Sequence, residues 1–165
     1  MSLLGYPDRH HLNAAAGWLE LGAVAEADRE LAGIGAANLF HPEVLGFRWH
    51  LLVEQHAWLD ALEVARMHVR TAPKSAEAWI HQSFILHELK RTDEAFTELQ
   101  RVADDFAEVG TIPYNLACYT CCLGRIEEAR GWLKRACTLQ GKRETIAMAA
   151  DDPDLAALKN ELPKL

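Results

Sequence analysis

The pair Glu26-Ala27 returns every 34 residues along the chain, as Asp60-Ala61, Glu94-Ala95 and Glu128-Ala129. A constant period of this length is typical of a solenoid of helix–turn–helix units, in which each unit buries its apolar face against its neighbours. The acids fall at the start of the second helix of each unit, where interaction with the helix dipole explains them. The period therefore predicts an all-α solenoid, a fold whose surface holds another chain.

The period divides most of the chain into four repeats, residues 8–41, 42–75, 76–109 and 110–143. Each repeat is expected to form two helices, with approximate ranges 9–22 and 25–38, 43–56 and 58–71, 76–89 and 92–106, and 112–123 and 126–139. Thr92 is the expected N-cap of the sixth helix. The turn between paired helices falls at Gly22, His56, Lys90 and Gly124, and glycine suits a turn with positive φ.

Residues 144–165 are expected to cap the fourth repeat, so that residues 1–165 form a single domain. Residues 144–150 predict a ninth helix. The following segment Asp151-Asp152-Pro153-Asp154 marks a helix end and a restart, because proline is favoured in a first helical turn. Leu155 and Leu158 then lie on the face expected to point inward.

The repeats resemble the tetratricopeptide repeat (TPR) of bacterial-type proteins. Trp79 and Ser83 match the Trp and small-residue positions of that unit in repeat three, Leu116 and Ala117 match its Leu–Gly pair in repeat four, and Pro73 matches its terminal proline. The resemblance covers residues 8–143. It implies a right-handed helical solenoid of four TPR helix–turn–helix units plus C-terminal capping helices.

Repeat two departs from this pattern at Trp49, which stands where the family has Gly, Ala or Ser. A bulky indole at a close helix crossing is expected to push the two helices apart or to force a local shift, because packed cores tolerate extra volume poorly.

Composition limits the classes of partner. The chain has 165 residues, half of them apolar, with 17 basic and 24 acidic side chains, a net charge of −7 and a pI near 5.6. Such a surface repels a phosphate backbone, so no nucleic acid is expected. We expect no signal peptide at the N-terminus, and no window approaches the ~18 apolar residues of a spanning helix, so we expect a cytoplasmic protein without membrane contact.

In TPR proteins the first helix of each repeat lines a concave groove, and the resemblance carries that role onto this chain. The candidate peptide-binding residues are Asn13, Glu20, Phe47, His50, Glu54, His81, Phe84, His87, Glu88, Tyr114 and Asn115. The aromatic rings would seat apolar side chains, and the two asparagines would hydrogen-bond a partner's backbone. The alternative for Phe47 and Phe84 is simple packing of helix against helix.

Acidic residues also recur at fixed positions of the first helices. Glu20, Glu54 and Glu88 share one repeat position, and Glu43 and Glu77 share another. The hypothesis is an acidic groove that favours a basic or amide-rich segment. The alternative is that these acids only keep a solvated face soluble.

The favoured function is a protein- or peptide-binding adaptor or scaffold, with a monomer slightly favoured. Some TPR domains clamp a carboxylate with cations on successive first helices. The matching positions here carry no cation: Leu12, Ala16, Phe47, Glu77 and His81. A second interpretation resembles the TPR chaperones of type III secretion, although those usually have three repeats behind an N-terminal dimerisation helix, and here the repeats begin near residue 8.

A third interpretation is a metal- or thiol-dependent sensor that uses the histidines of the first helices and the cysteines. Cys118, Cys121 and Cys122 contain a CxxC spacing, but inside a helix, and we expect reduced thiols that pack as small apolar groups. No metal, no cofactor and no catalytic set of nucleophile, base and orienting group are predicted, so the chain is not expected to be an enzyme.

Overall fold

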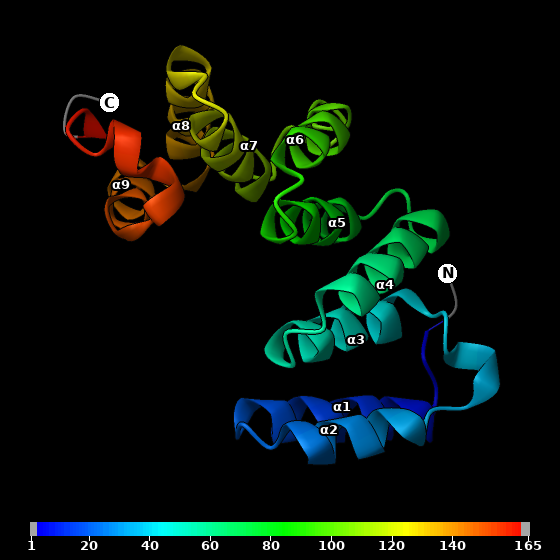
Figure 1. Cartoon of the computed structure of the whole chain (residues 1–165). Coiled ribbons are helices and arrows are strands. Elements are labelled where there is room, and N and C mark those ends of the chain that lie inside the picture. Colours follow the sequence, from blue (N-terminus) through cyan, green and yellow to red (C-terminus); the bar gives the residue numbers. More distant parts are fainter. Residues whose placement is uncertain (1–2, 163–165) are drawn as a thin grey trace. The chain divides into compact units, whose positions relative to one another are not determined.

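The computed structural model describes residues 3–162, among which there are helices and turns but no β-strand (Figure 1). The first two repeats contain α1 (Asp8–Glu20), α2 (Val24–Ala32), the 3₁₀ helix η1 (Ala36–Asn38), α3 (Pro42–Glu54) and α4 (Trp58–Thr71). The next two contain α5 (Ala76–Glu88), α6 (Thr92–Gln100), α7 (Thr111–Cys122) and α8 (Ile126–Gln140). The chain continues with α9 (Lys142–Asp151) and the 3₁₀ helix η2 (Pro153–Leu158). The prediction of an all-α fold of paired helices is confirmed.

The chain divides into two compact units, Met1–His81 and Gln82–Leu165, and the division falls inside α5. The expected single domain over residues 1–165 stays a prediction. Residues 163–165 of the expected cap lie outside the described part of the chain.

The periodic alanines are fully buried, as the repeat predicts. Ala27, Ala61, Ala95 and Ala129 each expose 0 % of their surface. Within unit 1, α1 packs on α2 and α3 packs on α4, and within unit 2 α7 packs on α8. A side chain that ends at Cβ lets two helix backbones approach closely, so these positions exclude larger residues.

The turn position between paired helices has a left-handed backbone in every repeat. The φ angles are 73° at Gly22, 55° at His56, 62° at Lys90 and 75° at Gly124. The expected positive φ is therefore confirmed. His56 and Lys90 adopt this left-handed conformation although they carry a Cβ atom. A Cβ atom makes a positive φ energetically costly for residues other than glycine.

The α-helix α2 ends at Ala32, earlier than the expected residue 38. Gly33 and Gly35 follow at once, and glycine favours leaving a helix. The segment is then tied to α1 by Asp8, whose carboxylate accepts hydrogen bonds from Gly35 N at 2.9 Å and Asn38 Nδ2 at 2.6 Å.

The helix α6 also ends early, at Gln100 instead of residue 106. The following residues form successive turns, with bonds such as Asp105 N to Val102 O at 3.1 Å. Asp104 and Asp105 would place negative charge at a helix C-terminus, which the dipole disfavours. At the other end, the expected N-cap is wrong, because Arg91 is the N-cap and Thr92 already lies in the helix.

The C-terminal residues of unit 2 cover α7, as η2 packs against that helix. Leu155 and Leu158 are completely buried, which confirms the inward face predicted for them. The expected helix restart is also confirmed, since Pro153 occupies the first turn of η2 and Asp152 Oδ1 accepts a hydrogen bond from Asp154 N at 2.9 Å.

Candidate functional site

Trp49 of α3 stacks face to face on His81 of α5. The ring centroids are 3.7 Å apart, the planes differ by 3°, and both side chains are buried, with 7 % and 5 % of their surfaces exposed. The indole that the repeat pattern identifies as oversized therefore has an aromatic partner from the next repeat. This contact fixes the plane of the His81 ring.

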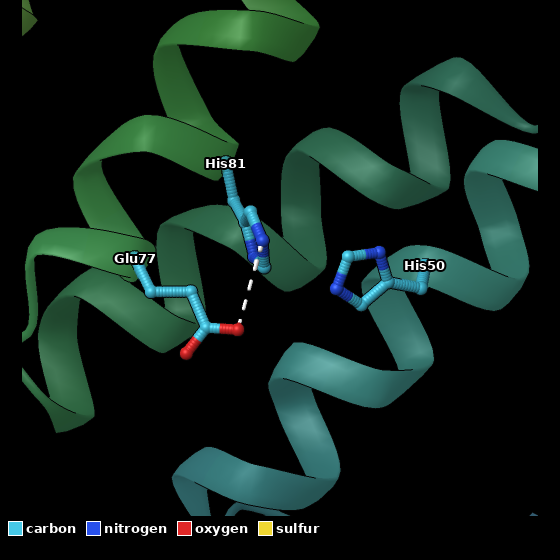
Figure 2. A group of neighbouring side chains, drawn as sticks. All are labelled: His50, Glu77 and His81. Atoms are coloured by element: carbon cyan, nitrogen blue, oxygen red, sulfur yellow. Dashed lines mark ion pairs between the residues drawn. The ribbon is translucent and has the colours of Figure 1, made fainter. Parts of the chain in front are cut away.

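His50 of α3 and Glu77 and His81 of α5 point toward one another beside this stack (Figure 2). One nitrogen or oxygen atom from each side chain lies within 4.8 Å of the other two. His81 Nε2 is 3.8 Å from Glu77 Oε1, which is too long for a hydrogen bond. We call these three residues the histidine–glutamate cluster.

A fourth polar residue, His68 of α4, is buried beside the cluster with 1 % of its surface exposed. Its ring centroid is 6.0 Å from that of His81. Gly46 of α3 leaves room for this arrangement, because a Cβ there would lie 3.3 Å from Glu77 Oε1 and 3.5 Å from His68 Cε1. Residues of α3 and α4 from repeat two and of α5 from repeat three thus surround the buried imidazoles.

Burial keeps these imidazoles neutral. It lowers the pKa of His81 to about 3, with further lowering from the nearby His50 and His68. Burial also lowers the pKa of His68, against which the Glu77 carboxylate acts in the opposite direction. Nδ1 of each ring is buried without a hydrogen-bond partner among the described residues. The structure therefore holds two buried, neutral imidazoles with unused polar atoms.

The remaining candidates of unit 1 divide into exposed and packed residues. Asn13, Glu20, His50 and Glu54 are exposed on the first helices α1 and α3. Phe47 is half-buried and packs against the core of this unit, as its alternative interpretation states. Among residues 3–162, no ion pair involves Glu20 or Glu54.

One of the acids expected in the groove already has a cation. Arg9 of α1 forms a two-pronged ion pair with Glu43 of α3, in which Arg9 Nη2 donates to Glu43 Oε1 at 2.7 Å. This hydrogen bond holds the pKa of Glu43 below its usual value. Position 2 of the repeat therefore carries a cation in repeat one and an acid in the next two, a signal that was readable in the sequence.

In unit 2 the chain's own C-terminal residues cover several candidates. Tyr114 and His87 are buried, with 8 % and 7 % of their surfaces exposed. The Tyr114 hydroxyl donates to Asp152 Oδ2 at 2.9 Å, and His87 Nε2 lies 3.0 Å from Asp154 Oδ2. The sequence predicts that residues 144–165 cap repeat four and that residues 151–154 mark a helix end and a restart, but it does not indicate that Asp152 and Asp154 contact Tyr114 and His87.

The same two aspartates face the thiols of α7. Cys118 Sγ is 3.5 Å from Asp152 Oδ2, and Cys122 Sγ is 3.4 Å from Asp154 Oδ1. Cys122 is exposed, but partial desolvation of its thiol and then the Asp154 charge raise its pKa to about 12, and burial with Asp152 raises the pKa of Cys118 far above its usual value. Since the thiolate is the reactive form, this environment disfavours thiol sensing.

Phe84, Glu88 and Asn115 are the other candidates in unit 2, and all three are half-buried. Asp154, Cys122 and His87 could together offer ligands to a metal, and so could Cys118 with the two aspartates. These atoms are already joined to one another by the hydrogen bonds described above. In the histidine–glutamate cluster, by contrast, the ligand atoms of His50, Glu77 and His81 have no such bonds within residues 3–162.

Comparison with solved structures finds the same fold in MamA proteins. A MamA RS-1 double mutant shares 19 % identity over 98 % of this chain and 97 % of that chain, with a TM-score of 0.71. MamA from Desulfovibrio magneticus RS-1, from residue 41 onward, shares 17 % identity over 98 % of this chain and 94 % of that chain, with a TM-score of 0.72. A further MamA crystal structure shares 17 % identity over 91 % of this chain and 88 % of that chain, with a TM-score of 0.71.

At these identities the likeness shows the fold alone, a solenoid of paired helices. No protein-family model matches the chain, and no curated protein matches it either. None of the helices within residues 3–162 is both long and apolar enough to cross a bilayer.

Proposed function

We propose that the chain is a protein-binding adaptor that holds a basic peptide segment on the first helices of unit 1, α1 and α3. One observation carries this proposal: Glu20 and Glu54, which share a repeat position, are both exposed and lack an ion-pair partner within residues 3–162. Paired helices in a solenoid commonly present such surfaces to another chain. Asn13 and His50 add hydrogen-bonding groups on the same two helices.

The proposal places the site in unit 1 because unit 2 already binds part of its own chain. Residues 152–158 lie against α7 and bury Tyr114, a candidate groove residue. Exposed acids without cations attract Lys and Arg side chains and repel carboxylates. The favoured partner is therefore a Lys- or Arg-rich extended segment of a cytoplasmic protein, bound by a monomeric adaptor without catalysis.

The test is the binding of a fluorescently labelled Lys-rich peptide to the full chain, followed by anisotropy at low and at physiological salt. The double substitution Glu20→Lys with Glu54→Lys should weaken binding at least about ten-fold at low salt. The matched control, Asp60→Lys with Glu63→Lys, changes the net charge equally but lies on the second helix α4.

The two variants separate a local site from a general charge effect. Equal weakening by both would mean that affinity follows net charge alone, and the proposed site would be wrong. Absence of binding by the unmodified chain would also contradict the proposal. The chaperone interpretation predicts a dimer, which size-exclusion chromatography with light scattering would detect.

A further inference from the structure

We infer that the histidine–glutamate cluster is a binding site for a divalent transition-metal ion of the zinc type, with His50, Glu77 and His81 as its protein ligands. The three side chains come from two neighbouring helices, α3 and α5, and point toward one another (Figure 2). Two imidazole nitrogens and one carboxylate oxygen form a donor set that zinc commonly accepts, with a fourth position left for water or a partner's side chain.

The buried residue of the set is His81, and its ring nitrogens make no hydrogen bond to the described residues. His81 is 95 % buried, and its Nε2 faces Glu77 at 3.8 Å without a hydrogen bond. Nδ1 of this ring is buried without a hydrogen-bond partner among the described residues, whereas Nε2 faces the Glu77 carboxylate and is the nitrogen that an ion shared with Glu77 would bind. The possible metal-ligand atoms of His87, Cys122 and Asp154 in unit 2 differ, because hydrogen bonds already join them to one another.

The geometry requires only small movements of exposed side chains. The ligand atoms lie within 4.8 Å of one another, whereas tetrahedral zinc places its ligands about 3.3 Å apart. His50 and Glu77 are exposed, and the His50 ring already meets the His81 ring edge-on, with 5.0 Å between the centroids. His81 stays in place because Trp49 stacks on it at 3.7 Å.

The groups that face the His81 ring are Glu77 on its own helix, His50 on α3 and His68 on α4. His81 Nδ1 has no acceptor among the described residues, and metal-binding histidines usually have one.

The test is a calorimetric titration of the chelator-treated full chain with Zn²⁺, alongside Co²⁺ absorption and tryptophan fluorescence, to which Trp49 contributes from its position on the His81 ring. We expect one Zn²⁺ per chain and the visible absorption of tetrahedral Co²⁺. His50→Ala and Glu77→Gln should each weaken binding at least about ten-fold. Both residues are exposed, so the fold should be retained. The control His10→Ala removes an exposed histidine outside the cluster and should leave binding unchanged.

Two outcomes would overturn the inference. The first is no saturable binding below millimolar zinc. The second is binding that His50→Ala and Glu77→Gln leave intact while Cys122→Ser abolishes it, which would place the metal in unit 2. This test uses no peptide, so its result is independent of the adaptor proposal.

Discussion

The indole of Trp49 lies parallel to the imidazole of His81, with 3.7 Å between ring centroids, and the two residues belong to successive repeats. The repeat pattern predicts a small residue at position 49. In the structure the Trp49 indole instead packs on His81, and both residues are buried. His81 in turn belongs to the histidine–glutamate cluster. Trp49, the residue that departs from the repeat pattern, thus packs directly on the histidine–glutamate cluster of unit 1.

Trp49→Ala should destabilise the protein, although it restores the small residue of the repeat. Removing a buried aromatic side chain costs about 3–5 kcal/mol through lost burial and the cavity that remains. Chemical denaturation of the full chain measures the change. Trp18→Ala, at a more exposed tryptophan, should cost less than about 1 kcal/mol. A Trp49→Ala variant as stable as the parent would mean that the indole is overpacked.

Acid should destabilise the metal-free protein below pH 6.5. Burial lowers the pKa of His81 to about 3 in the folded chain from its usual value of 6.5, so the unfolded chain binds more protons between these values. The free energy of unfolding therefore falls as pH falls through this window, by up to about 1.4 kcal/mol per pH unit for one such group. Buried His68 adds to the effect in the same direction.

The variant His81→Phe isolates this contribution, because it keeps an aromatic ring against Trp49 and removes the titrating group. Denaturation curves from pH 7 to pH 4, in the presence of chelator, should show a shallower pH dependence than the parent. His10→Ala should leave the slope unchanged. Parallel curves for the parent and His81→Phe would show that His81 titrates normally in the folded chain.

Substitutions at two of the left-handed turn positions should change the stability of the fold in opposite directions. Gly22→Ala should cost about 1 kcal/mol, because Gly22 has a φ of 73° and an added Cβ would meet no atom within 4 Å, which leaves backbone strain as the cause. Lys90→Gly, at a φ of 62°, should stabilise the fold by up to about 1 kcal/mol. Thermal unfolding compares them, and changes of the same sign would contradict the backbone explanation.

Asp154→Asn should increase the reactivity of Cys122. The Asp154 carboxylate, 3.4 Å from Sγ, contributes to the raised pKa of that thiol, so its neutralisation should increase the thiolate population several-fold. The rate of alkylation by iodoacetamide, resolved by cysteine with mass spectrometry, measures this change. Asp151→Asn neutralises an exposed neighbouring acid and serves as the control. Equal rates in both variants would indicate that the Asp154 charge does not suppress the reactivity of the Cys122 thiol.

Several candidate residues could be predicted from the sequence, but their environments could not. The period placed Glu20 and Glu54 at equivalent positions, and both are exposed. The same reasoning placed His87 and Tyr114 on first helices, yet both are buried by contacts with residues 152–154. A repeat position gives the helix face of a residue, whereas a returning segment from elsewhere in the chain decides whether that face is covered.

The sequence by itself determined the paired helices, the buried alanines and the left-handed turns. These features depend on interactions within one 34-residue unit, which recur in register and leave a periodic signal. Only the tertiary structure decided that Trp49 stacks on His81, that His68 lies buried beside them, and that Asp152 and Asp154 face α7. Those contacts join residues that are distant along the chain and occur once, so no local pattern encodes them.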